Sequence, residues 1–463
     1  MKEKRINRRD FLKVASTVAV GSMLAACAPK TTTSPTEAGK EAPTEGPKGL
    51  TTEEITLRLW HWDSFLADCY NQVGANFTKQ HPNMKVAVEL TAYGEYSQKV
   101  AASIAGGVPP DVVGTIGEHF TNMAGQDQLF DLDAYIQASK FDISDYHPGN
   151  LSQNSWGGKL LAIPYTADGM WWFYNVDEFT KKGLKTPYQY WKEGTWDWDT
   201  AMSLAKELTS GEGVTKNFGY GGLDYGNYYD VLPSSVSNGG TGLFDEKYTA
   251  CQLSGEKYVQ LLQWGIDMRP YSPGPEEQAT SNPQSGRVMQ WMDWSPMGPS
   301  YSKSFPFKFS YAPPPPSPRT KKLVFCGDAP AFGILKEVKH PDESWALVMW
   351  LNTPESTTII FNVTGQEPPR MSVAQDPNLW SNNKAFPDSA IGHELTVTRF
   401  KEGFYNTPKV SNFAEMWQAY NEEISLAWVD KQSLADATSK ANDRINALLK
   451  EATIDQDRLY WTS

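Results

Sequence analysis

Cysteine and histidine are scarce in this sequence of 463 residues, which contains four cysteines and six histidines. The cysteines are far apart, so they form neither the framework of a disulfide-rich domain nor the closely spaced pairs of a zinc site: Cys27, Cys69, Cys251 and Cys326. The histidines are scattered in the same way. We therefore expect no metal, no organic cofactor and at most one disulfide among the last three cysteines.

Long apolar runs are also missing. Residues 14–26 form a weakly apolar run of 13 residues, which is too short to cross a bilayer as a helix, and no later run is long and apolar enough to span. The run follows Arg8 and Arg9 and ends in small residues, as a secretory signal does. The paired arginines resemble a twin-arginine (Tat) export signal. We therefore expect residues 1–26 to be a signal peptide.

A single cysteine follows this run. Leu24, Ala25, Ala26 and Cys27 resemble a bacterial lipobox, in which the cysteine becomes the new N-terminus and carries a lipid. Residues 27–50 are rich in Pro, Thr, Glu and Gly and cannot bury a core, so we expect a flexible tether. The alternative is that Cys27 is an ordinary residue just past a cleavage site. The lipobox interpretation predicts a protein anchored by lipid to the extracytoplasmic face of the cell membrane.

Positive charge is in deficit, because the formal net charge of the chain is −12. Removal of residues 1–26 would take away six basic and two acidic residues and lower the net charge to −16. Such a surface repels nucleic acid and anionic headgroups. We therefore expect no nucleic-acid partner and no membrane contact other than the lipid anchor.

Strand and helix patterns alternate after the tether. Residues 55–60 alternate apolar and polar side chains as a half-buried strand does, and residues 65–77 carry an apolar side chain at every fourth position as a helix does. A strand at 86–90, a helix at 96–104 and a strand at 111–113 follow. This order predicts a mostly parallel sheet with helices on both faces.

In such a sheet, ligands bind beyond the carboxyl ends of the strands. Two segments occupy those ends, WHWD at residues 60–63 and GTIGEH at residues 114–119. We therefore take Trp62, Asp63 and Glu118 as ligand-binding candidates.

Seven segments resemble, in order and over nearly the whole chain after residue 50, the extracellular solute-binding proteins of ABC importers. The resemblance is to the family 1 carbohydrate binders, which include maltose-binding protein. The segments are FTKQHPNMKVAVEL, YSQKVAASIAGGVPPDVV, GGKLLAIPYTADGMWWFYNVDEFTKKGL, GTWDWDTAMSLAKEL, GRVMQWMDWSP, KHPDESWALVMWLNTPEST and QSLADATSKANDRINALL. The resemblance implies a two-lobed, class II periplasmic-binding-protein-like α/β fold, in which each lobe is a mostly parallel sheet flanked by helices and a hinge joins the lobes.

The resemblance also implies where the chain passes between the lobes. By position, the crossings would lie near residues 163–166, 323–328 and 364–369. Lobe 1 would then consist of residues 51–165 and 326–365, and lobe 2 of residues 166–325 and 366–463.

Aromatic side chains are abundant, at 13% of the residues, with 17 tryptophans. A pyranose stacks its apolar face on an aromatic ring and needs hydrogen-bond partners for its hydroxyls, so sugar sites combine Trp or Tyr with Asp, Glu and Asn. Segments 224–230, 290–294 and 326–329 offer this combination. They add the following ligand-binding candidates: Asp224, Tyr225, Tyr228, Trp291, Asp293, Trp294 and Asp328.

For some of these tryptophans, packing in the core is the alternative. Trp291 and Trp294 could simply pack a strand against a helix. Trp417 lies near the position of a tryptophan that stacks on ligand in the family, but it belongs to an apolar helix stripe and is predicted to be a core residue.

Two other functions stay open. A secreted glycoside hydrolase or lyase would need two carboxylates facing one bond. Asp197 and Asp199 resemble such a pair, but they lie where a helix begins, where acids cap free N–H groups. Motifs of serine hydrolases, zinc proteases and nucleotide-binding enzymes are absent from the sequence.

The same fold could also bind a peptide or a polyamine, but a charged ligand would favour Lys or Arg in the cleft and the candidate segments contain neither.

The sequence therefore predicts a binding protein rather than an enzyme. It would capture a sugar or oligosaccharide by closure of the hinge and deliver it to the membrane permease of an ABC importer. We expect it to act as a monomer.

Overall fold

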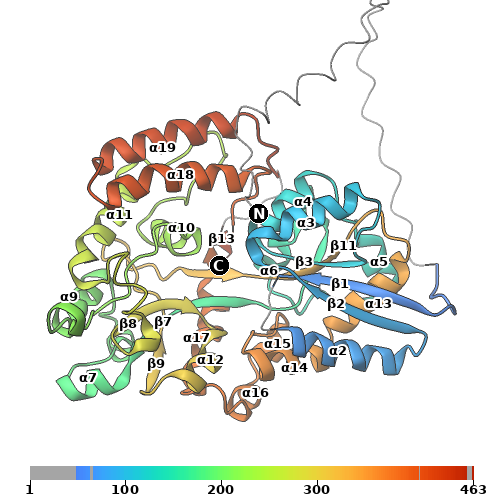
Figure 1. Cartoon of the computed structure of the whole chain (residues 1–463), viewed down its shortest axis with the longest axis horizontal. Coiled ribbons are helices and arrows are strands. Elements are labelled where there is room, and N and C mark those ends of the chain that lie inside the picture. Colours follow the sequence, from blue (N-terminus) through green and yellow to red (C-terminus); the bar gives the residue numbers. More distant parts are fainter. Residues whose placement is uncertain (1–47, 63–65, 406, 456–460, 463) are drawn as a thin grey trace, which may run out of the picture. The chain divides into compact units, whose positions relative to one another are not determined.

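The computed structural model describes residues 48–62, 66–405, 407–455 and 461–462, the last two by their backbone alone. Two sheets organise this part of the chain (Figure 1). In spatial order, the first sheet contains β2, Met84–Leu90; β1, Ile55–His61; β3, Val112–Thr115; β11, Ala331–Ile334; and β6, Ala162–Pro164. The second contains β13, Trp461–Thr462; β12, Phe404–Tyr405; β10, Phe325–Asp328; β7, Asp168–Asn175; and β8, Gln290–Trp294, with β9, Phe309–Ala312, also paired to β7.

The first sheet is mostly parallel, as the sequence predicts. Strand β1 pairs in parallel with β2 and β3, and β11 runs antiparallel to β3 and β6. Alternation along β1 buries Leu57 and Leu59 on one face and Trp60 on the other. Helices therefore cover both faces.

The helices that cover the first sheet pack in two hydrophobic cores, one on each face of the sheet (Figure 1). On the Leu57 face lie α2, Ala67–Gln80; α13, Pro341–Leu351; and α14, Pro354–Thr364. On the Trp60 face lie α3, Tyr93–Ala105, and α4, Gly117–Gly125. The connecting segments contain α5, Asp133–Ser139; α6, Pro148–Gln153; and the hairpin of β4, Ser155–Trp156, with β5, Lys159–Leu160.

The second sheet differs from the mostly parallel sheet that we predicted. Strand β7 pairs antiparallel with β8, β9 and β10, whereas β10 pairs in parallel with β12. For this lobe, a mostly parallel sheet was what the family resemblance implied. The partners of β7 come from segments more than a hundred residues away in sequence, so no local pattern sets the direction of these strands.

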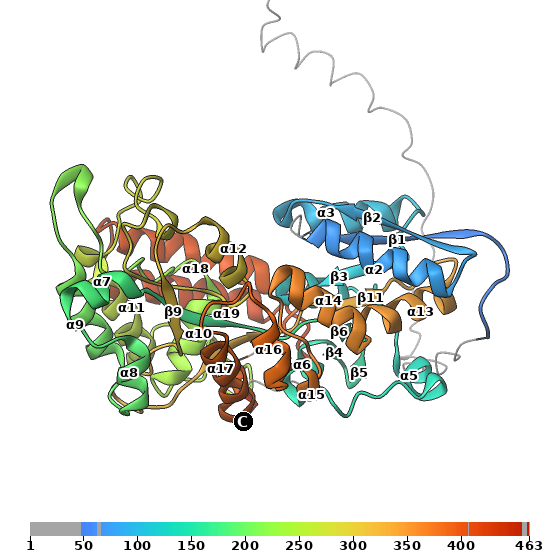
Figure 2. The same cartoon turned by 90° about the horizontal axis from the view of Figure 1, so that it is seen from below.

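Four helices share one core beside the second sheet (Figure 1). Two of them are long and antiparallel: α18, Phe413–Trp428, and α19, Leu434–Leu449. The other two are α10, Tyr228–Ser237, and α11, Glu256–Met268. Helix α17, Ser389–Glu402, packs against β9 beside α15, Met371–Ala374, and α16, Pro377–Asn382 (Figure 2). The remaining helices are α7, Val176–Lys182; α8, Pro187–Lys192; α9, Trp198–Leu208; α12, Met297–Ser304; and the short 3₁₀ segments η2, Gly213–Thr215; η3, Arg269–Tyr271; and η4, Pro283–Ser285.

The chain passes between the two sheets three times, at residues 165–167, 329–330 and 365–370. Hydrogen bonds hold these crossings together, because the Tyr165 N–H donates to the Pro330 carbonyl at 3.0 Å and the Ala167 N–H donates to the Glu367 carbonyl at 2.9 Å. The middle crossing comes later than predicted. Residues 326–328, which we assigned to lobe 1, belong to β10 and pair with the second sheet.

The carboxylate pair in TWDWD is confirmed as part of a helix start. The Asp197 carboxylate accepts the N–H of Thr200 at 2.9 Å and caps α9, and Asp199 lies in the first turn. Thr353 and Ser433 cap α14 and α19 in the same way.

The three cysteines in the described part of the chain, Cys69, Cys251 and Cys326, are buried and free. Among the described helices, none combines the length and the apolar character that crossing a membrane requires.

Candidate ligand-binding cleft

Two predicted residues follow neighbouring parallel strands of the first sheet. Trp62 comes directly after β1, and Glu118 lies in the first turn of α4, just after β3. Tyr93, at the start of α3, joins them because its hydroxyl donates to Glu118 Oε1 at 2.7 Å and its ring meets Trp62 edge-on with 6.0 Å between centroids. The carboxyl ends of three adjacent strands thus build one wall of a cleft.

The facing wall comes from elements of the second sheet. Tyr228, the first residue of α10, donates its hydroxyl to the other oxygen of Glu118. Tyr229 donates to Asp328 Oδ2 at 2.8 Å, and the ring of Trp294, at the end of β8, meets Tyr229 edge-on with 4.9 Å between centroids. Glu118 is therefore hydrogen-bonded from both walls.

A glycine lets these walls approach. Gly117 has a φ of +41°, and a Cβ on it would lie 2.6 Å from the hydroxyl oxygens of both Tyr228 and Tyr229. A φ in this range and a contact this short both disfavour a larger residue, so glycine fits this position best.

The walls enclose a cavity of about 480 Å³, which we call the cleft cavity. Its lining is aromatic with one carboxylate: Trp62, Tyr93, Ile116, Glu118, Gly226, Asn227, Tyr228, Tyr229, Trp294 and Trp417. No lysine or arginine is found among the described residues that line it. Such a lining suits the flat apolar face and the hydroxyls of a sugar ring.

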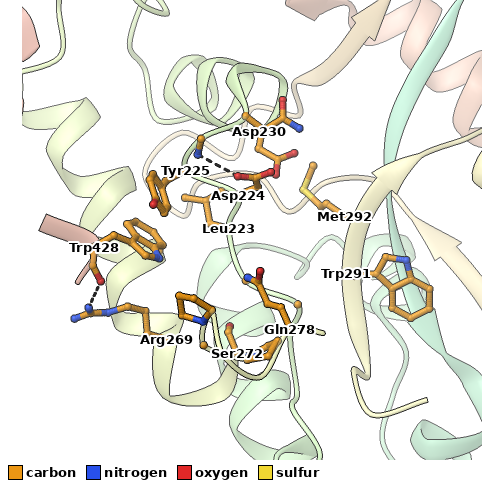
Figure 3. Close-up of a pocket in the computed structure, with 18 of the residues that line it drawn as sticks. Leu223, Asp224, Tyr225, Asp230, Arg269, Ser272, Gln278, Trp291, Met292 and Trp428 are labelled. Carbon is orange, nitrogen blue, oxygen red and sulfur yellow. Dashed lines mark hydrogen bonds between the residues drawn. The ribbon is translucent and has the colours of Figure 1, made fainter. Parts of the chain in front are cut away.

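A larger cavity of about 1060 Å³ lies on the side of the second sheet, and we call it the acidic cavity (Figure 3). It shares Gly226, Asn227 and Trp294 with the cleft cavity. Its lining includes the predicted residues Asp224, Tyr225, Trp291, Asp293 and Trp294, together with Asp230, Arg269, Gln278 and Trp428. The two cavities therefore adjoin.

The titratable groups around the cleft are neutral or acidic. Burial lowers the pKa of His61 to about 3 and also lowers the pKa of His119, so both rings are uncharged at neutral pH. Burial, with a further contribution from Glu118, raises the pKa of Asp328 to about 7. Burial also raises the pKa of Tyr228 and Tyr229 well above the ordinary value, so both hydroxyls keep their protons.

The predicted residues occupy different places in this arrangement. Trp62, Glu118, Tyr228 and Trp294 line the cleft cavity, and Asp224, Tyr225 and Asp293 line the acidic cavity. Two tryptophans have mixed roles. Trp291 lines the acidic cavity but is only 3% exposed, and it stacks on Phe173 in the core with 5.7 Å between ring centroids. Trp417 is a buried core residue, as predicted, and also lines the cleft cavity.

Asp328 lies behind Tyr229 instead of lining either of these cavities. Asp63 and Cys27 are outside the described residues.

Several residues that line the two cavities were not predicted from the sequence. Tyr93 follows the end of β2, so the rule that pointed to Trp62 and Glu118 could have found it. Tyr229 stands beside the candidate Tyr228. Trp428 ends α18 and packs on Tyr225 with 4.5 Å between centroids, and no sequence signal links these two residues.

Across the described residues, no group of three or more His, Cys, Asp or Glu side chains is arranged to hold a metal ion. The cleft offers hydrogen-bond acceptors, tyrosine hydroxyls and aromatic faces.

Known proteins share this fold. A substrate-binding protein of Listeria monocytogenes, solved in complex with cycloalternan, superposes with a TM-score of 0.74 at 20% identity, over 86% of this chain and 99% of that protein. A solute-binding protein of Thermotoga lettingae bound with α-D-tagatose gives a TM-score of 0.71 at 17% identity, over 85% of this chain and 99% of that protein. These similarities confirm the two-lobed fold class.

Sequence relatives agree. An ABC transporter extracellular-binding protein of Pyrococcus horikoshii is 26% identical over 214 residues, which are 45% of this chain and 46% of that protein. The chain spans about half the length of the curated relatives it matches. The sequence model of the bacterial extracellular solute-binding proteins matches residues 66–358, which is more than half of the chain. The resemblance seen in the seven segments is thereby confirmed, and the protein belongs to the family of bacterial extracellular solute-binding proteins.

Proposed function

We propose that this protein captures a saccharide outside the cytoplasm and serves as the substrate-binding component of an ABC importer. The family supports a binding role, and relatives named as ABC transporter binding proteins support the importer. The solved neighbours named above hold cycloalternan and tagatose, which supports a sugar ligand. One observation carries the proposal. Four sequence segments that are far apart place Trp62, Glu118, Tyr228 and Trp294 around one cavity.

The chemistry of that cavity suits a sugar. Trp62 and Trp294 come from opposite walls and offer aromatic surface for the C–H face of a pyranose. Glu118 and the tyrosine hydroxyls offer acceptors and donors for the hydroxyls of a sugar. In the structure, the tyrosines donate hydrogen bonds to Glu118. A ligand would replace these bonds with its own, so that no buried polar group is left unpaired.

Capture would proceed by movement about the three crossings. We propose that the first sheet and its helices form one lobe and the second sheet and its helices the other, divided at residues 165–167, 329–330 and 365–370. Ligand contacts one lobe first, and contacts that exist only when both lobes engage then stabilise the closed form.

Location and partners complete the proposal. Cys27 would carry the lipid, and residues 27–50 would tether the protein to the extracytoplasmic face of the membrane, within reach of the permease. The protein would work as a monomer, without nucleic acid or metal. The formal charge of −16 expected after loss of residues 1–26 is consistent with a surface that avoids anionic lipid.

A thermal-shift screen of the purified full-length protein against mono- and oligosaccharides tests the proposal, with amino acids, peptides and polyamines as controls. A saccharide at a hundredfold excess over its Kd should add about 2.7 kcal/mol to the free energy of unfolding. The saccharide should remain intact after overnight incubation. Cleavage of the saccharide would point to an enzyme instead, and stabilisation by the controls alone would exclude a sugar ligand.

A further inference from the structure

Carboxylates are concentrated in the acidic cavity. Asp224, Asp230 and Asp293 all line it; Asp224 is exposed, Asp293 is half-buried and Asp230 is 5% exposed. The carboxyl groups of Asp224 and Asp230 lie next to each other (Figure 3). Three carboxyl groups thus line one cavity.

Asp230 is incompletely paired. Its carboxylate accepts the backbone N–H of Asp224, but its Oδ1 is buried and has no hydrogen-bond partner in the described part of the chain. Burial, then the negative charges of Asp224 and Asp293, raise the pKa of Asp230 well above its ordinary value. A buried carboxylate in this situation costs free energy unless a cation or a donor compensates it.

The protein supplies little compensation. Two cationic residues are found among the described lining residues, Lys216 and Arg269. Arg269 pairs with Asp430 at 2.9 Å and donates to the Trp428 carbonyl at the edge of the cavity (Figure 3). Lys216 donates to the Pro270 carbonyl at 3.4 Å and lies over the ring of Phe218. In the described part of the chain, neither forms an ion pair with Asp224, Asp230 or Asp293.

Other carboxylates in and beside the two cavities accept hydrogen bonds from the protein's own donors. Glu118 accepts from Tyr93 and Tyr228, and Asp328 accepts from Tyr229 and from the N–H of Ala329. In the acidic cavity, Asp293 accepts from Tyr301 and from the N–H of Trp294, and Asp224 accepts the N–H of Gly226. Among these carboxylates, the buried oxygen without a hydrogen-bond partner in the described part of the chain is therefore that of Asp230.

We propose that the acidic cavity binds a sugar unit that carries a protonated amine. The ammonium pairs with Asp224 and Asp293, and Asp230, next to Asp224, acts as a positioning residue. Tyr225 and Trp428, which pack on each other, provide aromatic surface for the same sugar ring. This inference rests on the proposed function, since it names the class of saccharide that the cleft and the acidic cavity take together.

Matched pairs of ligands test it. Calorimetric titration of the full-length protein compares cellobiose with the chitosan disaccharide, which has amines in place of the C2 hydroxyls, and glucose, galactose and mannose with their 2-amino counterparts. For the pair that fits best, the amine should bind about tenfold more tightly or better, because an ion pair replaces the hydrogen bond of an uncharged hydroxyl to the carboxylate. Spermidine serves as an amine without a sugar.

Charge-removing variants assign the preference to the cavity. In Asp230→Asn and in Asp293→Asn, the ratio of the two affinities should fall below about threefold. In Glu207→Gln, which removes an exposed charge of α9 outside the cavity, the ratio should stay as in the wild type. Should Asp230→Asn fail to fold, Asp224→Asn and Asp293→Asn, which alter more accessible side chains, carry the same test.

The outcomes separate the inference from the proposed function. Equal binding of neutral and amine-bearing saccharides would overturn the inference and leave the proposed function standing. A preference that survives in all the aspartate variants would also overturn it, because the preference would then arise elsewhere. Absence of binding by every saccharide, with or without binding of spermidine, would overturn both.

Discussion

Hydrogen bonds connect the side chains that line the cleft to one another. Glu118 stands at the centre, because tyrosines from both walls donate to it. Gly117 beside it leaves the space into which two tyrosine hydroxyls fit. Substitutions of Gly117 and Glu118 should therefore change the affinity for ligand.

Gly117→Ala should weaken saccharide binding at least about tenfold and lower the free energy of unfolding by roughly 1–2 kcal/mol, because the new methyl meets Tyr228 and Tyr229 and alanine resists a positive φ. Titration calorimetry and urea unfolding measure the two effects. The matched control is Gly107→Ala, since Gly107 has a φ of +68° and no atom within 4 Å of its Cβ position. That variant should lose stability only, and equal losses of affinity in both variants would refute the steric explanation.

Asp328 should make the stability of the protein depend on pH. Its pKa is about 7 in the folded chain, against an ordinary value of 3.8, so the folded state retains a proton that the unfolded state releases. This contribution is fully present below about pH 4 and is lost as the pH rises through 7, at up to about 1.4 kcal/mol per pH unit. Urea unfolding between pH 4 and 8 should therefore show a steeper decline for the wild type than for Asp328→Asn. Parallel curves would exclude Asp328 as the source.

Helices and strands place these side chains where sheets offer ligand sites. On the first sheet, Trp62, Tyr93 and Glu118 follow the carboxyl ends of β1, β2 and β3. On the second, the contributions come from the start of α10 and the end of β8. Caps make the helix starts well defined, and they explain carboxylates that would otherwise resemble catalytic ones.

Removal of the cap of α9 should affect stability and leave binding unchanged. Asp197→Ala should lower the free energy of unfolding by about 1 kcal/mol, because the N–H of Thr200 loses its acceptor. Asp199→Ala, which removes an exposed acid from the same first turn, should cost less. Chemical unfolding measures both variants, and a saccharide titration of Asp197→Ala should give the wild-type Kd. A loss of ligand affinity in Asp197→Ala would reopen a direct role for this carboxylate.

The molecule as a whole is organised around the three crossings between its sheets. Arg399 of α17 is buried, pairs with Glu367 at 2.9 Å and also donates to the Ala167 carbonyl, so it connects two of the crossings. Ser295 and Thr396 donate to the same Glu367 carboxylate, each at 2.5 Å. A buried ion pair thus connects two of the three crossings.

Arg399→Met should lower the free energy of unfolding by about 3 to 5 kcal/mol, because it leaves the Glu367 charge buried without its partner. The double variant with Glu367→Gln should recover part of that loss. Arg444→Met, which breaks exposed ion pairs with Glu422 and Glu423, is the comparison and should change stability far less. Urea unfolding measures all three. Equal effects of the buried and the exposed variants would show that burial of the pair does not matter.

Local patterns were enough for much of the fold. The alternation in β1, the helix stripe of α2 and the carboxyl-end rule identified the first sheet and the positions of Trp62 and Glu118, because each depends on residues close together in the chain. The caps at Asp197, Thr353 and Ser433 were predictable for the same reason. Family resemblance extended this to two lobes.

The remaining features required contacts between distant residues. The antiparallel direction of β8, β9 and β10 beside β7, and the place of residues 326–328 in the second sheet, depend on strand pairing across more than a hundred positions. The cleft contact of Tyr228 with Glu118 and the gathering of Asp224, Asp230 and Asp293 around one cavity arise in the same way. Periodicity and capping act within a few residues, so the sequence alone specifies elements and their ends. Pairing and burial depend on the whole chain, so tertiary structure alone decides which acids share a cavity.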